Sequence, residues 1–353
     1  MTRVRVFAVL VACLVAATLC SAQSFVLDIP RQSQHAVLTQ RIGITDITVN
    51  YHRPLANGRK IWGSVVPYGQ VWRAGANENT LITFTDPVTI EGKPLDKGTY
   101  GLHMIPTEDQ WTIAFSKMSD AWGSFTYKQE EDALRVTVKP QSTELHDALT
   151  YDFDDLKPES AVLTLRWEKV AVPFKIGVDV NNIVADSLHK QLRGLSQYTW
   201  EGWDDAANVL LASKSHLDDA LRYEDRSIQV EDRFDNEMTK SQILEAMGKK
   251  EESVGARNKA LEKATPLQLH VYARGLQAQK KQDEAFAIFK SNYKKYPNEW
   301  FVHSGMGRVY TAQGDFDNAI KEMKIARDTA PEPQKAAFEG LIKRLQNKED
   351  INK

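Results

Sequence analysis

Cysteine is scarce in this sequence, whose 353 residues contain only two, Cys13 and Cys20. Both lie within residues 1–22, which we interpret as a cleavable signal peptide. The mature chain would then have no disulfide, no cysteine-based zinc site and no thiol nucleophile. A chain of this length can bury a core without disulfides, so their absence is compatible with export.

The signal-peptide interpretation depends on the order of residue types. A basic pair, Arg3 and Arg5, precedes an apolar run over 6–19. The small residues Ser21 and Ala22 follow it, which completes the pattern of a secretory signal. The run is shorter than the ~20 residues of a spanning helix. We therefore expect a bacterial periplasmic or secreted protein with no membrane span after cleavage.

The sequence also lacks an excess of either charge, because 45 Lys and Arg stand against 47 Asp and Glu. This balance gives no indication of nucleic acid or an anionic membrane as a partner. Neither Gly-x-Ser-x-Gly nor His-Glu-x-x-His occurs, and there is no glycine-rich phosphate loop. We therefore expect no metal and no cofactor, and we favour a binding protein over an enzyme.

Residues 44–176 have the alternation of a β domain. β-Branched and aromatic residues recur with a period of two between turn signals, as in a sandwich or barrel. The predicted strands are 46–51, 80–85, 100–104, 110–115, 134–138, 149–153 and 161–167. The rows predicted to form the core are Ile47, Val49 and Tyr51; Trp111, Ile113 and Phe115; and Leu163, Leu165 and Trp167. The opposite rows, predicted to face solvent, include Thr48, Asn50, His52, Ala114, Asp152, Asp154, Thr164 and Arg166.

Residues 182–348 change to the period of amphipathic helices. A motif begins at residues 215, 248, 280 and 314, in steps of 33, 32 and 34 residues, which is the period of helix-turn-helix solenoids. The motifs end in the small residues Ala220, Ser253, Ala285 and Ala319, which would allow close helix packing. The last repeat resembles a tetratricopeptide repeat through Met306, Gly307, Tyr310, Gly314, Ala319, Met323, Ala326 and Pro331.

These patterns together predict a multidomain chain with both β and α parts. The signal peptide at 1–22 precedes an all-β sandwich, or a jelly-roll-like barrel, at 24–177. An α-helical solenoid of tetratricopeptide-like repeats follows at 183–348. Residues 177–182 are interpreted as the linker.

The β region also resembles a known family. The segments that carry the resemblance are 51–54, 58–63, 66–69, 71–78, 92–95, 98–100 and 167–168. Through them, residues from about 30 to 176 resemble an uncharacterised bacterial family, the domain of unknown function numbered 2911. The resemblance implies a β-rich fold and export, and a helical repeat region can follow such a domain. It implies no activity, so no catalytic residue is transferred.

One long connection in the β region is a candidate ligand site. Residues 54–79 join two predicted strands with little periodicity, and connections of this length are often functional. Aromatic and polar side chains are interleaved there, as in small-molecule sites. The candidate ligand-binding residues are Arg59, Trp62, Tyr68, Trp72, Arg73, Asn77 and Glu78, with His52 and His103 on predicted strands. Alternatively, the loop buries its own aromatics and Arg73 pairs with Glu78.

Two further groups of residues are candidates for binding. His52 and His103 could meet Asp152 or Asp154 on the polar sheet face and hold a metal. Their spacing fits no metal motif, so structural histidines are favoured. In the repeats, a concave groove could receive a protein or peptide partner. The candidate groove residues are Tyr272, Arg274, His303 and Arg308.

Two functions follow from the sequence. The favoured one is an exported binding or scaffold protein, whose β domain holds a small molecule or glycan and whose repeats dock a protein partner. The alternative is an exported hydrolase that uses carboxylates, with Glu78 acting together with Asp152 or Asp154.

Overall fold

The computed structural model describes residues 30–352, which fall into two compact units that meet in sequence at Ile183 and Val184. We call them the β unit (to Ile183) and the helical unit (from Val184). The predicted signal peptide at 1–22 lies outside the described residues. Within the described part of the chain, no helix combines the length and apolar character needed to cross a membrane.

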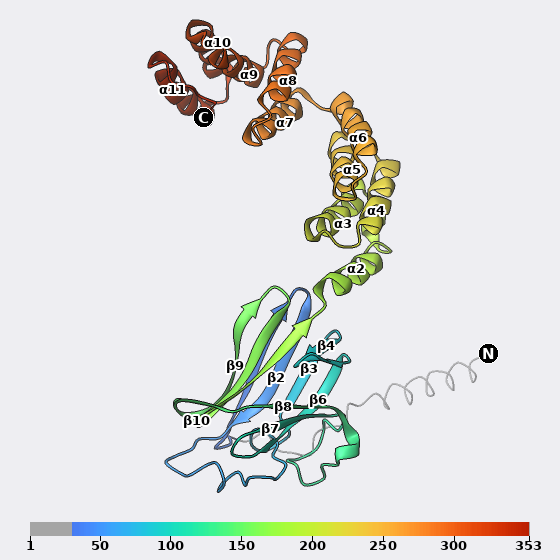
Figure 1. Ribbon diagram of the computed structural model, residues 1–353, viewed down its shortest axis with the longest axis vertical. Helices are drawn as coiled ribbons and strands as arrows, with labels where there is room; N and C mark the ends of the chain where they lie inside the picture. The colour runs from blue at the N-terminus through green and yellow to red at the C-terminus, as the bar shows by residue number, and fades with distance from the viewer. Residues whose placement is uncertain (1–29, 353) are drawn as a thin grey trace, which may run out of the picture. The chain divides into compact units, whose positions relative to one another are not determined.

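The β unit consists of two antiparallel sheets (Figure 1). The six-stranded sheet has the order β1 (Gln34–Ile42), β2 (Thr45–Arg53), β3 (Leu81–Phe84), β6 (Gly98–Pro106), β7 (Trp111–Ser116) and β8 (Asp132–Val138). The four-stranded sheet has the order β5 (Lys93–Leu95), β4 (Val88–Ile90), β10 (Ser160–Val178) and β9 (Gln141–Lys157).

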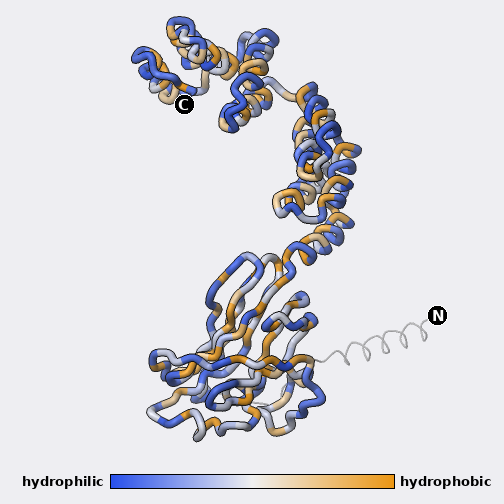
Figure 2. The backbone as a smooth tube through the Cα atoms, viewed as in Figure 1, coloured by the Kyte–Doolittle hydropathy of each residue, from blue (hydrophilic) through white to orange (hydrophobic). Residues whose placement is uncertain are grey.

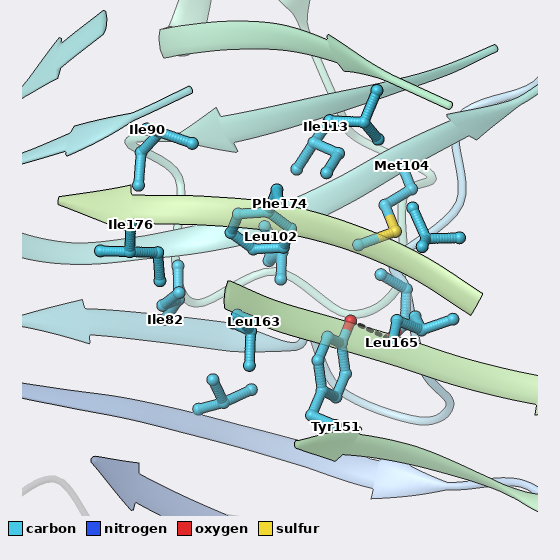
Figure 3. Packing of buried hydrophobic residues seen from close by; sticks show 14 of the residues in the cluster. Ile82, Ile90, Leu102, Met104, Ile113, Tyr151, Leu163, Leu165, Phe174 and Ile176 are labelled. Carbon is cyan, nitrogen blue, oxygen red and sulfur yellow. Dashed lines mark hydrogen bonds between the residues drawn. The ribbon is translucent and has the colours of Figure 1, made fainter. Parts of the chain in front are cut away.

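The core of the β unit lies between the two sheets, and both contribute side chains to it. In Figure 3, Leu102, Met104 and Ile113 of the six-stranded sheet lie close to Leu163 and Phe174 of the four-stranded sheet. The predicted inward rows of β2, β7 and β10 are confirmed, because all nine side chains are buried. Alternation of apolar and polar residues therefore decides which face of each strand is buried.

Two residues of the predicted solvent-facing rows are buried instead. Ala114 lies between His103 and Arg135 in the register of β6, β7 and β8, and it is fully buried. Thr164 is 2% exposed, and its hydroxyl donates to Asp154 Oδ2 at 2.7 Å. A small side chain between larger neighbours is thus covered even on an outer face.

Strand limits depart from the prediction in two ways. The sequence pattern missed β1, β4 and β5, and it underestimated β9 and β10, which form a 17- and 19-residue hairpin. The expected linker at 177–182 is also wrong. β10 continues to Val178, and helix α2 (Val180–Gln191) begins two residues later.

The helical unit contains helix pairs along the chain (Figure 1). After α2 they are α3 (Trp200–Ser213), α4 (Leu217–Val230), α5 (Phe234–Ala246), α6 (Lys250–Lys263), α7 (Pro266–Ala278), α8 (Gln282–Lys295), α9 (Trp300–Ala312), α10 (Phe316–Thr329) and α11 (Glu332–Gln346). Hydrophobic and hydrophilic residues alternate along these helices (Figure 2). The predicted fold class, an all-β part followed by an α-helical solenoid, is confirmed.

The repeat motif has a direct structural meaning. Helices α4, α6, α8 and α10 each begin two residues after a predicted motif start. The small residues that end the motifs, Ala220, Ser253, Ala285 and Ala319, are all buried. Close packing explains the glycine at 307, since a Cβ there would lie 2.8 Å from Cε of Met323. Small residues therefore set the distance between neighbouring helices.

Candidate functional site

The long connection 54–79 is attached to both sheets of the β unit. At its start, Leu149 N donates to Pro54 O at 3.0 Å, and Ala56 N donates to Asp147 O at 2.7 Å, which ties it to β9. Near its end, Trp72 and Met104 exchange two backbone hydrogen bonds of 2.8 Å, which ties it to β6. The connection is therefore a fixed part of the domain that spans from one sheet to the other.

Trp62, one of the candidate ligand contacts, is a core residue, as in the alternative in which the loop buries its own aromatics. It is 7% exposed, and its ring centroid lies 4.7 Å from that of Trp111 and 5.8 Å from those of Trp72 and Trp167. Its indole Nε1 is buried and has no hydrogen-bond partner among the described residues. The cluster of four tryptophans places the middle of the connection inside the fold.

A cleft of about 480 Å³ opens beside this tryptophan cluster. Trp72 and Trp167, whose rings stack with centroids 5.9 Å apart, form part of its wall. Arg59 and Arg73 also line it. The remaining lining residues are Gln32, Ser33, Pro54, Leu55, Asn57, Val65, Val66, Gly75 and Ala76. The cleft thus combines flat aromatic surface with two guanidinium groups.

The two arginines are held by backbone carbonyls. Arg73 Nη1 donates to Asn77 O at 2.6 Å, and the guanidinium lies 6.0 Å from the ring centroid of Phe125. Arg59 Nη2 donates to Leu55 O at 2.6 Å. Within residues 30–352, no carboxylate lies within 4.0 Å of either group. Burial lowers the pKa of Arg73, and the charge of Glu78 opposes this effect. Both guanidinium charges are therefore available to an anion.

The alternative interpretation of the loop assumed an ion pair between Glu78 and Arg73, but Glu78 pairs with Arg31 instead. Its carboxylate contacts Arg31 Nη1 at 2.7 Å and His52 Nδ1 at 3.5 Å. Burial alone would raise the pKa of Glu78, but its own backbone N–H, Arg31 and His52 outweigh burial and lower it. For His52, burial lowers the pKa more than Glu78 raises it. Glu78 is thus an ionised partner of Arg31.

His103 lies apart from the cleft. The register of β2, β3 and β6, continued by two residues, places Asn79 between His52 and His103. The two histidines are therefore not direct cross-strand neighbours. His103 Nδ1 lies 2.9 Å from Ser124 Oγ, and burial lowers the pKa of His103 to about 4. A neutral, hydrogen-bonded histidine fits the structural role. No group of three or more His, Cys, Asp or Glu residues in the described chain could hold a metal.

The cleft therefore contains only part of the predicted ligand site. Arg59, Trp72 and Arg73 line it, whereas Trp62, Tyr68, Asn77, Glu78, His52 and His103 do not. Tyr68 is 41% exposed and packs at Gly63. The prediction missed Trp167, which was assigned to the core, and the segment around Ser33, which shows no strong pattern.

The carboxylates of the alternative hydrolase, Glu78, Asp152 and Asp154, do not line this cleft. Asp154 contacts Arg166 Nη2 at 2.5 Å and borders a different hollow from the one described above. Burial alone would raise the pKa of Asp154, but the hydrogen bonds from Thr164 and Arg166 outweigh burial and lower it. Glycoside cleavage needs one carboxyl with a raised pKa as the acid. Glu78 and Asp154 both have lowered values, and Asp152 is exposed on β9.

The predicted groove residues of the helical unit have different roles. His303 is buried, with Nδ1 2.6 Å from Glu322 Oε2 and Nε2 2.9 Å from Pro297 O, so it joins neighbouring segments and does not line a groove. Tyr272 is half-buried beside the core of α7–α9. Arg308 is 8% exposed. Of the four, Arg274 alone is exposed.

Comparison with known proteins confirms the predicted family resemblance of the β region. Residues 33–176 match the family described as "Protein of unknown function (DUF2911)". The crystal structure of YrrB, a TPR protein with an unusual peptide-binding site, is similar at 14% identity and a TM-score of 0.28, over 48% of this chain and 88% of that one. The crystal structure of the APC/C hetero-tetramer Cut9-Hcn1 is similar at 15% identity and a TM-score of 0.30, over 48% of this chain and 33% of that one. No curated protein matches the chain.

Proposed function

We propose that this chain is an exported binding protein that holds a small organic anion in the cleft of the β unit and docks a partner protein on its helical repeats. One observation carries the first half of this proposal: Arg59 and Arg73 line a cleft beside stacked tryptophans, and no carboxylate among residues 30–352 lies within 4.0 Å of either. A guanidinium binds a carboxylate or phosphate through paired hydrogen bonds. The tryptophan faces suit an apolar body.

The size of the cleft fits this assignment. Its volume of about 480 Å³ lies in the range of about 300–1,000 Å³ that small-molecule sites occupy. The guanidinium groups of Arg59 and Arg73 are already oriented by carbonyl oxygens, so little side-chain order is lost on binding. A neutral glycan would leave both charges unused, so we favour an anion.

Partner docking and export rest on separate features. Stacked helix pairs present extended surfaces on which solenoid proteins bind partners. Export rests on the basic, apolar and small-residue order of residues 1–22. Amino-terminal sequencing of protein recovered from outside the cytoplasm would test it, with Gln23 or Ser24 expected as the first residue.

Arg73→Gln should remove anion binding while leaving the fold intact. Benzoate and benzamide are matched probes, because they share shape and differ in charge. We expect benzoate to bind the full chain and benzamide to bind about tenfold more weakly. Arg73→Gln should reduce benzoate binding to the level of benzamide. Ligand-observed NMR titration measures both, with Arg41→Gln as the control, because Arg41 is an exposed arginine on β1.

Equal binding of the two probes would show that the ligand is not selected by charge. Unchanged benzoate binding in Arg73→Gln would remove this cleft as the site. Circular dichroism of the variant separates a binding loss from unfolding.

A further inference from the structure

The helical unit carries a cluster of basic side chains that spans two repeats. His270, Arg274 and Gln277 follow one another at i, i+4 and i+7, so they share one face of α7. Arg308 on α9 stands 34 residues after Arg274, which is one repeat step. Helices α7 and α9 are in contact. The repeat therefore brings equivalent arginines onto neighbouring helices.

Arg308 is a buried cation without an acidic partner. It is 8% exposed, and no carboxylate in the described chain lies within 4.0 Å of it. Nη1 donates to Ile351 O at 2.7 Å, but Nε is buried and unpartnered among these residues. Burial, with the charges of Arg274 and Arg344, lowers the pKa of Arg308 to about 10, and Asp350 opposes them. A buried cation without a paired carboxylate carries a desolvation cost, which a bound carboxylate would offset.

The neighbours of Arg308 extend this cationic surface to solvent. Arg274 is exposed, donates to Gln277 Oε1 at 2.6 Å, and likewise has no carboxylate within 4.0 Å in residues 30–352. His270 Nδ1 is buried and has no described partner. Burial, with Arg308 and Arg274, lowers the pKa of His270 to about 4, so this imidazole is neutral at pH 7. The charge of the site therefore comes from the two arginines.

Residues 349–352 of the same chain already lie against these helices. Gln277 Nε2 of α7 donates to Asn352 Oδ1 at 2.9 Å, and Arg344 Nε of α11 contacts Glu349 Oε2 at 3.2 Å. Asn352 Nδ2 donates to Arg308 O at 3.0 Å. Ile351 is 3% exposed and belongs to the apolar cluster that includes Phe338, Ile342 and Leu345 of α11. Amide and carbonyl groups of Ile351 and Asn352 thus hold the segment on α7 and α9, whereas Glu349 contacts α11 and Asp350 Oδ1 accepts from Asn352 N.

We propose that this face of α7 and α9 docks an acidic peptide segment of a partner protein, whose carboxylate binds Arg274 and Arg308. Residues 349–352 occupy part of the face until the partner displaces them. The inference rests on the proposed docking by the helical repeats and specifies its chemistry. Arginine pairs bind carboxylates with paired, charge-assisted hydrogen bonds, and arginine clusters recognise acidic motifs.

Fluorescence anisotropy with a labelled peptide tests this site on the full chain. The probe has the sequence of residues 347–352, and its matched control carries Gln and Asn in place of the two acidic residues. We expect the acidic peptide to bind, to weaken as salt rises, and to bind about tenfold more tightly than the control. Arg274→Gln should weaken it about tenfold. Arg226→Gln is the matched control variant, because Arg226 on α4 also donates to a glutamine three residues on.

A second variant tests the occupied state. Ile351→Ala should loosen residues 349–352 and strengthen binding of the acidic peptide several-fold. Equal binding of both peptides to the full chain and to Ile351→Ala would overturn the inference. So would equal affinities of Arg274→Gln and Arg226→Gln. A partner protein retained equally by the full chain and by Arg274→Gln would remove this site but keep docking by the repeats. Failure of any partner to bind either protein would remove docking itself.

Discussion

Replacing Glu224 with glutamine should stabilise the helical unit by on the order of 2 kcal/mol at pH 8. Glu224 lies in α4 and is fully buried. Burial, together with the nearby carboxylate of Asp204, raises the pKa of Glu224 to about 9. The folded chain must therefore keep this group protonated at a pH at which the unfolded chain releases the proton. Glutamine has nearly the same shape and carries no proton to lose.

The pH dependence has a definite sign. A carboxyl with a pKa raised from 4.5 to about 9 binds a proton in the folded state that the unfolded state loses above about pH 4.5. Its contribution to stability is fully present below that pH and is lost as the pH rises towards 9. Burial raises the pKa of Asp204 and Glu237 as well, so they add to the same trend. Wild-type stability should fall from pH 5 to pH 9, and Glu224→Gln should flatten the curve.

Urea unfolding followed by circular dichroism at 222 nm, at several pH values, measures this effect. Glu245→Gln is the control, because Glu245 is exposed on the neighbouring helix α5. We expect the two variants to differ little at pH 5 and clearly at pH 8. A Glu224→Gln curve parallel to that of the wild type would show that Glu224 is ionised in the folded protein.

Trp62→Ala should destabilise the β unit by about 3–5 kcal/mol, the usual cost of truncating a buried large aromatic side chain. Three other indole rings pack around Trp62, and each would lose contacts if the ring were removed. Because the connection 54–79 spans both sheets, a cavity at its centre cannot be filled by a small local shift. Chemical denaturation followed by near-ultraviolet circular dichroism reports the loss of this cluster.

Trp122→Ala is the matched control for the same type of substitution. Trp122 is 50% exposed, under the guanidinium of Arg31, and its loss should cost less than about 1 kcal/mol. If both variants unfolded at the same denaturant concentration, the connection would be a loosely attached loop. The connection could then move and bind a ligand through its exposed aromatic and polar side chains, as its composition indicates.

The arrangement of strands and helices could be predicted where the pattern is local. The two-residue alternation identified β2, β7 and the buried part of β10, and the repeat spacing located the starts of α4, α6, α8 and α10. It missed β1 because the apolar Val37 lies on the exposed row of this strand, at 55%, and the polar Gln40 lies on the inward row between Leu38 and Ile42. The alternation of apolar and polar residues is therefore too weak in β1 to identify a strand.

The site was only partly predictable, because composition does not distinguish a core aromatic from a ligand contact. Trp62 and Trp72 belong to one segment, yet one lies in the core and the other borders the cleft. Their difference depends on Trp167, which lies about a hundred positions later in the chain. The sequence pattern also could not predict the partner of Glu78, since Arg31 is 47 residues away and precedes the first strand.

The attachment of the connection 54–79 to β9 has a consequence for the order in which the domain assembles. Asn57 N donates to Asp147 Oδ1, a contact that spans 90 residues of sequence. During synthesis, the segment that carries Trp62 therefore emerges long before the strand that fixes it. Contacts of such high sequence separation slow folding. A nascent chain that ends before Asp147 would expose the tryptophan-rich segment, and protection of that segment by a chaperone would matter most at this stage.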